Sequence, residues 1–192
     1  ALVGLRKQFI CSARLDNLLS CFIALHSLLD SNDDCASILV CNDHEEVGSV
    51  SAAGADGPFL KSVLQRMLEA EEAEEGAASK ASAASFDRAI QNSVLLSVDN
   101  AHGVHPNFSD KHDAAHSPKL NAGPVIKINA NQRYASNSHT LALLKYICNR
   151  LDICHQSFVV RSHMCCGSTI GTISSALLGI ATVAVGIARF AL

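Results

Sequence analysis

An apolar run that ends in a cluster of charged residues is the strongest constraint on how this chain can fold. Ser37–Cys41 (SILVC) is typical of a buried β-strand, and the acidic turn Asp43–Ser49 (DHEEVGS) follows it directly. Acidic side chains at the carboxyl end of an interior strand lie in the crevice where open α/β sheets bind ligands. Two adjacent carboxylates are costly to hold together unless a cation or a proton separates their roles. The pattern predicts that Glu46 binds a metal ion and that Glu45 is a general base, the alternative being a polar strand end that faces solvent.

Two further predicted strands also lead to a carboxylate. Asp16 follows the short strand predicted at Phe9–Ala13, and Asp99 follows the apolar strand predicted at Ser93–Val98. Asp99 is therefore a candidate metal ligand at the same edge of the sheet. Asp16 has two interpretations: a metal ligand, or, with Asn17 as the other candidate, the N-cap of the helix that the apolar spacing predicts over residues 18–29.

Two histidines follow Asp99 in a loop that contains glycine and proline. His102 and His105 are candidate metal ligands or substrate contacts, because imidazole binds metals and exchanges protons near neutral pH. The alternative is that both are ordinary surface histidines. A Cys/His zinc site among residues 148–166 is another alternative, although its spacing matches no structural zinc pattern.

The rest of the chain alternates strands with helices. Apolar spacing predicts helices near residues 59–68, 141–151 and 170–177, and strands at 125–129, 156–161 and 182–185. Such alternation predicts a single α/β domain over residues 1–192, a three-layer α/β/α sandwich with a largely parallel central sheet. The Ala/Ser-rich residues 76–85 predict a flexible loop.

Charge and hydropathy exclude several classes of protein. A formal net charge of −3, with no Lys/Arg-rich cluster, argues against a nucleic-acid partner. The uncharged run Thr169–Ala188 is as long as a membrane span, but its periodicity changes at Gly179, which predicts a helix, a turn and a buried strand. We therefore expect no membrane partner. Eight cysteines with no signal peptide before them indicate free thiols in a reducing cytoplasm.

Several of these segments, in this order, resemble the signatures of the aspartyl aminopeptidase family. They are Ser12–Leu18 (SARLDNL), Asp43–Ser49, Ser97–Asn107 (SVDNAHGVHPN), Gly123–Asn129 (GPVIKIN), Gln132–Ala135 (QRYA) and Cys166–Gly171 (CGSTIG). The variant Gly54–Pro58 (GADGP) resembles the bacterial branch of that family. The resemblance covers nearly the whole chain, and it implies a zinc-exopeptidase-like α/β/α fold.

The resemblance also implies the chemistry of a co-catalytic zinc exopeptidase that removes an N-terminal residue, preferably Asp or Glu. By motif position, Asp16 would bridge two Zn²⁺ ions, Glu46 would bind one of them and Asp99 the other. Glu45 would be the general base. Two cations about 3.5–4 Å apart need a shared carboxylate to offset their repulsion, and their charge lowers the pKa of water. Carboxylate-rich sites also accept Mn²⁺ or Co²⁺.

The same resemblance implies the substrate contacts and the partners. Lys127 and Tyr134 match family positions near the substrate, where they are suited to stabilising an oxyanion or holding a carboxylate. His105 matches a residue of the same pocket. The implied partners are peptides with acidic N-termini and further copies of the chain, because the family forms dodecamers.

The family pattern is incomplete in this sequence. The family takes one zinc-binding His from near its N-terminus and another from just beyond a C-terminal strand, and we expect this chain to lack both, together with the dimerisation domain. Within the chain, His163, Cys165 and Ala184 differ from the usual family residues. A zinc ion with a missing ligand can take water instead, at a loss of affinity. The alternative function is therefore an impaired relative or fragment that serves as an assembly or binding subunit.

Overall fold

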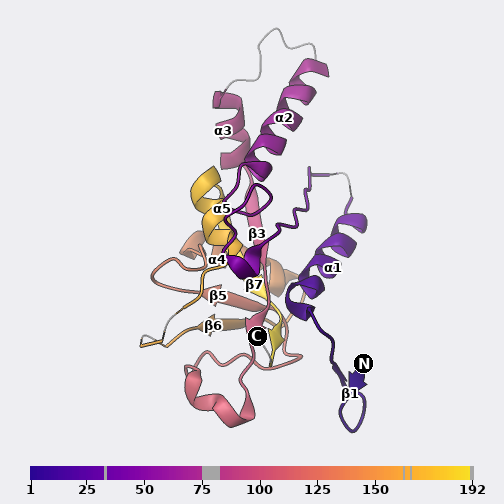
Figure 1. Cartoon of the computed structure of the whole chain (residues 1–192), viewed down its shortest axis with the longest axis vertical. Coiled ribbons are helices and arrows are strands. Elements are labelled where there is room, and N and C mark those ends of the chain that lie inside the picture. Colours follow the sequence, from indigo (N-terminus) through magenta and orange to yellow (C-terminus); the bar gives the residue numbers. More distant parts are fainter. Residues whose placement is uncertain (33, 75–82, 162, 165, 191–192) are drawn as a thin grey trace.

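A four-stranded sheet forms the centre of the molecule (Figure 1). The computed structural model describes residues 1–32, 34–74, 83–161, 163–164 and 166–190. The strands are β3 (Val94–Val98), β5 (Val125–Ile128), β6 (Gln156–Val159) and β7 (Ala181–Gly186), in the spatial order β3-β7-β5-β6. β3 pairs parallel with β7, and β5 pairs parallel with β6, while β5 and β7 are antiparallel. The predicted mixed α/β fold with a mainly parallel sheet is confirmed.

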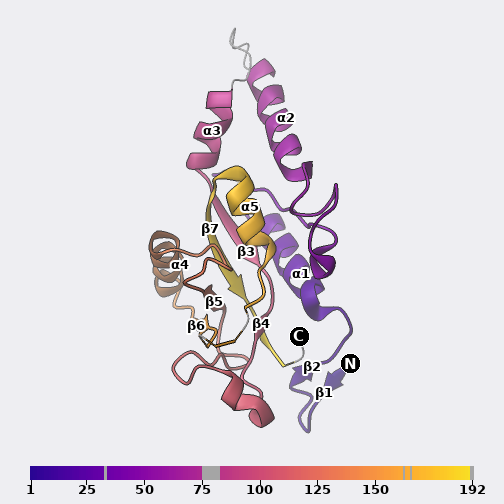
Figure 2. The ribbon, with the colours of Figure 1, turned by 60° about the vertical axis from the view of Figure 1, so that its left-hand side comes forward.

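The described residues form five α-helices: α1 (Leu15–Leu29), α2 (Phe59–Glu74), α3 (Ala83–Gln91), α4 (Ser138–Arg150) and α5 (Ile170–Leu178). Of these, α4 and α5 pack against the sheet, while α2 and α3 project beyond it (Figure 1). Figure 2 shows α4 on one side of the sheet and α5 on the other, so helices cover both faces of β7. A sheet covered on both faces requires strands that are apolar throughout, and all but the first residue of β7 are buried.

The uncharged run near the end of the chain folds as predicted. α5 ends at Gly179, whose φ of 71° is left-handed, and the chain turns there directly into β7. Within the described ranges, none of the helices is both long enough and apolar enough to span a membrane.

Short elements connect the larger ones. β1 (Leu2–Val3) and β2 (Phe9–Ile10) form an antiparallel pair, and β4 (Ala101–His102) and β8 (Ala188–Arg189) form a parallel pair. Two 3-10 helices are also present: η1 (Glu45–Val47) lies within the acidic turn, and η2 (Pro106–Lys111) begins directly after His105. β4 follows β3 and β8 follows β7, so the parallel pairing of β3 with β7 continues beyond the main sheet as the β4–β8 pair. Arg189 of β8 therefore lies beside His102, in the segment that follows Asp99.

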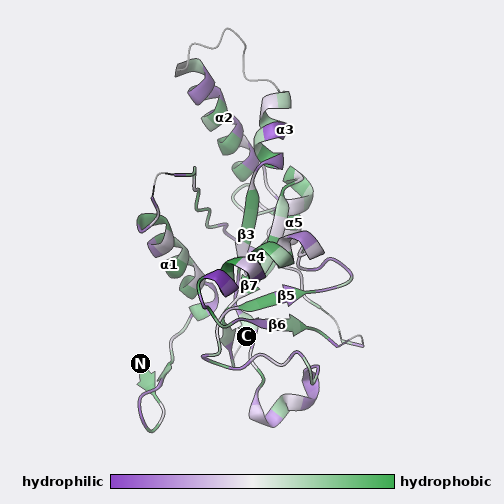
Figure 3. Ribbon diagram, turned by 180° about the vertical axis from the view of Figure 1, so that it is seen from behind, coloured by the Kyte–Doolittle hydropathy of each residue, from purple (hydrophilic) through white to green (hydrophobic). Residues whose placement is uncertain are grey.

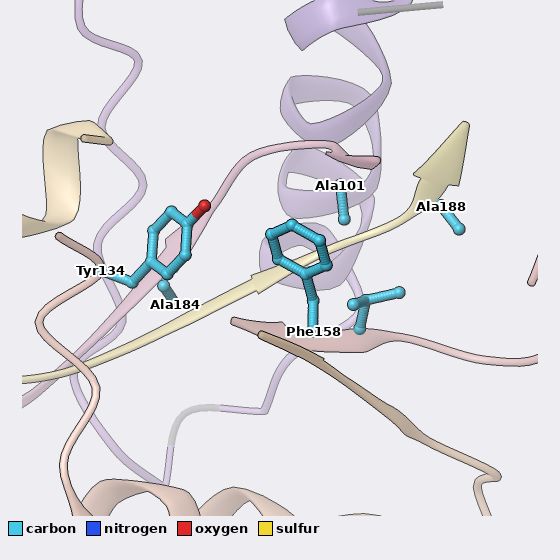
Figure 4. Close-up of a cluster of buried hydrophobic side chains, with 6 residues drawn as sticks. Ala101, Tyr134, Phe158, Ala184 and Ala188 are labelled. Carbon is cyan, nitrogen blue, oxygen red and sulfur yellow. The ribbon is translucent and has the colours of Figure 1, made fainter. Parts of the chain in front are cut away.

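The hydrophobic core is centred on β5 and β7. Val125 and Ile126 of β5 are fully buried, and Figure 4 shows the cluster formed by Ala101, Val125, Tyr134, Phe158, Ala184 and Ala188. Ala184, one of the positions at which the sequence departs from the family, is a core residue in this cluster. Tyr134 is in the same cluster, so a predicted substrate contact also contributes to packing.

The prediction of a buried strand at Ser37–Cys41 is wrong. Residues 35–42 contain no strand, and Ile38 is 52% exposed. A cleft of about 610 Å³, lined by apolar side chains, lies between this segment and β3, which pairs only with β7 among the described strands. A strand needs a neighbour that completes its backbone hydrogen bonds, and the apolar pattern alone does not supply one.

The helices of the N-terminal part carry exposed apolar residues. Figure 3 shows hydrophobic and hydrophilic residues side by side along α1 and α2, whereas β3 and β5 are hydrophobic.

The loop predicted at residues 76–85 can be compared with the structure only at its last three residues. Residues 76–82 lie outside the described residues, and Ala83–Ser85 form the first turn of α3.

Candidate active site

The acidic turn is held by left-handed residues at both of its ends. His44 (φ 60°) precedes the 3-10 helix η1, and Gly48 (φ 102°) follows it. The Asp43 carboxylate accepts a 2.8 Å hydrogen bond from the backbone N–H of His44, and the His44 ring bonds the Ser51 hydroxyl at 2.8 Å. These contacts fix the backbone that carries Glu45 and Glu46. Glu45 is half-buried, whereas Glu46 is exposed.

Three distant segments bring their carboxylates together at this turn. Burial raises the pKa of Glu45 above its ordinary value, and the negative charges of Asp99, Glu46 and Asp16 raise it further. Lys127 acts in the opposite direction on the pKa of Glu45. The geometry agrees with this effect, because Glu45 lines the same cleft as Asn17 and Val98, the neighbours of Asp16 and Asp99 in the sequence. The segments that carry Asp16, Glu45 and Asp99 therefore meet at one acidic site.

Asp99 stands at the end of β3 and is paired with a buried lysine. Lys127 Nζ on β5 lies 2.9 Å from Asp99 Oδ2, and the Lys127 side chain is only 5% exposed. Burial raises the pKa of Asp99, although the positive charge and hydrogen bond of Lys127 partly counteract this effect. Gly186 of β7 makes this position of the backbone possible, because a Cβ atom there would lie 2.0 Å from the backbone oxygen of Asp99.

Asp16 is held by two residues from other parts of the chain. Asn100 Nδ2 donates to Asp16 Oδ1 at 3.3 Å, and Arg189 Nη2 donates to Asp16 Oδ2. Neither described partner of the Asp16 carboxylate is a backbone N–H group of α1, and Asn17 Oδ1 accepts no hydrogen bond among the described residues. The prediction that Asp16 or Asn17 caps the helix is therefore wrong. The other interpretation of Asp16, as a metal ligand, stays a prediction.

Two amides fasten the start of α1 to the end of β3. Asn17 Nδ2 donates to the backbone oxygen of Val98 at 2.9 Å, and Asn100 Nδ2 donates to that of Leu15 at 2.9 Å. Asn100 is almost completely buried. These reciprocal bonds set the distance between Asp16 and Asp99, so the two asparagines position the carboxylates.

Tyr134 and His105, two of the predicted substrate contacts, have different surroundings. The Tyr134 ring is buried, with Lys127 Nζ 5.5 Å from its centroid. Burial and a hydrogen bond with Cys166 raise the pKa of the Tyr134 hydroxyl, so it stays protonated. His105 Nδ1 accepts from the backbone N–H of Asn107, and its ring packs against Phe108 and Phe190. None of the described contacts of His105 reaches the carboxylates.

The donor set of this site fits divalent cations, but the side chains are not arranged around one. Carboxylates such as those of Asp16, Glu46 and Asp99 are ligands that Zn²⁺ and Mn²⁺ accept. Over the described ranges, no group of three His, Cys, Asp or Glu side chains is positioned to hold a metal ion. The physical reason is visible in the contacts, since Asp16 and Asp99 each face a side-chain cation. The alternative Cys/His zinc site also has no such group among the described residues, and Cys165 lies outside them.

Three residues of the site were not predicted to belong to it. Asn17, Asn100 and Arg189 make the contacts described above, although no role in the site was assigned to them from the sequence. A local signal existed for the two asparagines, because each directly follows a candidate carboxylate and carries an amide that can satisfy a buried partner. Arg189 had no such signal, because its partner Asp16 is 173 residues away along the chain.

Comparison with known proteins identifies relatives of this chain. All 192 residues match the family described as "Aminopeptidase I zinc metalloprotease (M18)". A relative from Ectopseudomonas mendocina, "Probable M18 family aminopeptidase 2", is 57% identical over the whole chain, which covers 42% of that protein.

Two solved structures show the same fold. "Cryo-EM structure of the Ape4 and Nbr1 complex" contains a chain with a TM-score of 0.83 and 41% identity, and the match covers 97% of this chain and 35% of that one. "Structure of S. cerevesiae mApe1 dodecamer" gives a TM-score of 0.81 at 26% identity over the whole of this chain and 42% of that one. This chain thus spans less than half the length of these relatives. It belongs to the M18 family of aminopeptidase I zinc metalloproteases.

Proposed function

We propose that this chain is the catalytic part of an aminopeptidase that removes single residues, preferably Asp or Glu, from the N-termini of peptides. One observation carries the proposal: Asp16 and Asp99 are tied together through Asn17 and Asn100, and Glu45 lines the same cleft as Asn17 and Val98, where the charges of Asp16 and Asp99 help to raise its pKa. Family membership supports a zinc-dependent peptidase. The preference for acidic N-termini is our inference from the resemblance of the sequence motifs to aspartyl aminopeptidases.

Three carboxylates would hold the metal. Asp16 would be shared between two Zn²⁺ ions, Glu46 would bind one and Asp99 the other, with Mn²⁺ or Co²⁺ as substitutes. When bound, the ions would supply Lewis acidity that polarises the scissile carbonyl and acidifies water. The rigid attachment of Asp16 to Asp99 through Asn17 and Asn100 favours this role, because ligands that are held in place need less ordering.

Glu45 has the properties of a general base. Its carboxylate is half-buried, and its neighbours raise its pKa toward the range in which proton transfer at neutral pH is efficient. In the proposed mechanism Glu45 accepts a proton from the attacking water. It then donates that proton to the amine of the leaving peptide, so the carboxylate is regenerated.

Lys127, Tyr134 and His105 would contact the substrate. The Tyr134 hydroxyl stays protonated and can donate to an oxygen that gains negative charge, and Lys127 adds a positive charge beside it. His105 lies on the loop after β4, packed against Phe190. We place His105 at the outer side of the substrate pocket, where it would contact the peptide rather than the metal.

We also propose that the protein forms a homo-oligomer and acts in the cytoplasm. A dodecamer among the similar structures supports a homo-oligomer. The free thiols that the structure describes are consistent with a reducing cytoplasm.

The decisive experiment compares Glu45→Gln with the unchanged chain. Zinc content is measured by atomic absorption, and turnover is measured with an aspartyl chromogenic substrate. We expect unchanged zinc content and a turnover lower by about 10²–10⁴-fold, the range for loss of a general base. Glu69→Gln, on the exposed surface of α2, is the matched control and should keep full turnover. Equal turnover in Glu45→Gln and the unchanged chain would show that Glu45 is not the base.

A non-catalytic assembly subunit is the second candidate. One observation favours it: Asp16 and Asp99 already face Arg189 and Lys127, so each carboxylate has a counter-ion within the protein. This candidate predicts a folded chain that binds no zinc and cleaves no peptide. Stoichiometric zinc together with turnover would remove it.

A further inference from the structure

Arg189 lies where the proposed function requires a metal ion. Its guanidinium is ion-paired with Asp16, the carboxylate proposed to be shared between two cations. We propose that Arg189 is an internal counter-ion that occupies the cation position at Asp16 and must leave it before the metal ions bind. The inference rests on the proposed function, and it concerns how readily the site takes up metal.

Both oxygens of Asp16 are already engaged. Arg189 Nη2 donates to Oδ2, and Asn100 Nδ2 donates to Oδ1 at 3.3 Å. The Asp16 side chain is only 16% exposed, so solvent does not screen the pair completely. Because both oxygens already have partners, Arg189 and a metal ion would compete for the Asp16 carboxylate.

Strand pairing puts Arg189 at this position. β8 aligns Arg189 with His102 of β4, and the backbone N–H of Gly103 donates to the Arg189 carbonyl at 2.8 Å. The Arg189 backbone is thus fixed beside β4, the strand that follows Asp99 in the sequence, and from there the side chain extends to Asp16. The position of Arg189 therefore follows from the pairing of β8 with β4, and is not a chance contact of a surface side chain.

Arg189 is the more exposed of the two cations that face the carboxylates. Its Nε is buried with no hydrogen-bond partner among the described residues, so its present position leaves one donor unsatisfied. Its side chain is 22% exposed, whereas Lys127 is almost fully enclosed beside Asp99. Release of Arg189 into solvent would satisfy the buried donor, so Arg189 rather than Lys127 is the cation expected to leave the site.

The expected effect follows from competition. If the pair is intact in about nine molecules out of ten, the apparent dissociation constant for metal is about tenfold higher than that of the open site. Removing the guanidinium should remove this penalty. Arg189→Gln should therefore bind Zn²⁺ about tenfold more tightly than the unchanged chain.

Titration calorimetry with Zn²⁺ on the metal-depleted 192-residue chain tests the inference. The variants are Arg189→Gln, Arg189→Lys and the control Arg150→Gln, which removes the same charge from an exposed position on α4. We expect about tenfold tighter binding for Arg189→Gln, an intermediate constant for Arg189→Lys and no change for Arg150→Gln. In an Asp16→Asn background, Arg189→Gln should have no further effect, because the competing carboxylate is gone. Circular dichroism checks folding, and Arg189→Lys serves if the glutamine variant does not fold.

The outcomes separate this inference from the proposed function. Equal or weaker zinc binding by a folded Arg189→Gln chain overturns the inference and leaves the proposed metal site standing. A complete lack of zinc binding by every variant overturns the proposed site, and the inference falls with it.

Discussion

The two halves of this chain use apolar residues in different ways. In the part that contains β5, β6 and β7, most apolar residues of the strands are buried, and three valines and an isoleucine of β5 and β7 are at most 8% exposed. In the first fifty residues many large apolar side chains are exposed, and only Ser20 of α1 is buried. A similar apolar pattern is thus a core in one region and an open surface in the other. Burial depends on whether a neighbouring element covers the residue, and this information is not local in the sequence.

The proposed active site lies across the border of these regions. Asp99 and Lys127 come from β3 and β5 of the packed sheet, whereas Asp16, Glu45 and Glu46 come from the loosely covered N-terminal part. Hydrogen bonds from the Asn17 and Asn100 side chains connect the N-terminal part with the packed sheet. The geometry of the carboxylates therefore depends on a small number of hydrogen bonds rather than on a continuous core.

The largest expected contrast is between two isoleucines. Ile126→Ala, in the fully buried centre of β5, should lower the free energy of unfolding by about 4 kcal/mol, through lost burial and a new cavity. Ile10→Ala, at a residue of β2 that is 68% exposed, should change it by less than about 0.5 kcal/mol. Urea unfolding monitored by circular dichroism measures both values. Similar losses at the two positions would show that the N-terminal part is packed as tightly as the sheet.

The next contrast concerns charge within the packed half. Lys127→Met leaves the Asp99 carboxylate without its counter-ion, and we expect a loss of about 2–3 kcal/mol, below the value for a fully buried pair because Asp99 is 20% exposed. Asp99→Asn in the same background should restore part of that stability. Urea unfolding of the single and double variants gives the coupling between them. Additive effects would mean that the pair contributes nothing to folding.

A smaller contrast separates two helix starts. Asn137 begins α4 with a capping box, in which its side chain accepts from His139 and Thr140 N–H groups, whereas Arg14 makes no side-chain cap for α1. Asn137→Ala should cost about 1 kcal/mol, and Arg14→Ala should cost only a few tenths. Thermal unfolding of both variants checks the difference. Equal effects would contradict the assignment of the cap.

The smallest expected effect is a dependence on pH at the border itself. Because the pKa of Glu45 is raised in the folded chain, its ionisation opposes folding once the pH rises above its unfolded value of about 4.3. Glu45→Gln in metal-free buffer should therefore be more stable than the unchanged chain at pH 7. The advantage should disappear below about pH 4, where the carboxyl is protonated in both states. Thermal unfolding across this range, with Glu69→Gln as the control, measures it, and a pH-independent difference would contradict the cause.

The sequence predicted those features whose causes are local. The helix, turn and strand of residues 170–186 follow from the apolar periodicity and from Gly179, and the structure confirms them. The strand predicted at Ser37–Cys41 failed because strand formation depends on a partner, and the cap predicted at Asp16 failed because a distant arginine and asparagine bind that carboxylate instead. The roles of Glu45, Glu46, Asp99, Lys127, Tyr134 and His105 remain predictions.

Gly186 has a consequence for how this molecule tolerates change. Its missing side chain lets β7 pass within contact of the Asp99 backbone, so even a methyl group there would push the carboxylate out of place. A mutational survey should therefore find position 186 as intolerant as the reactive residues, although it takes part in no reaction. A search that ranks residues only by chemical reactivity would overlook it.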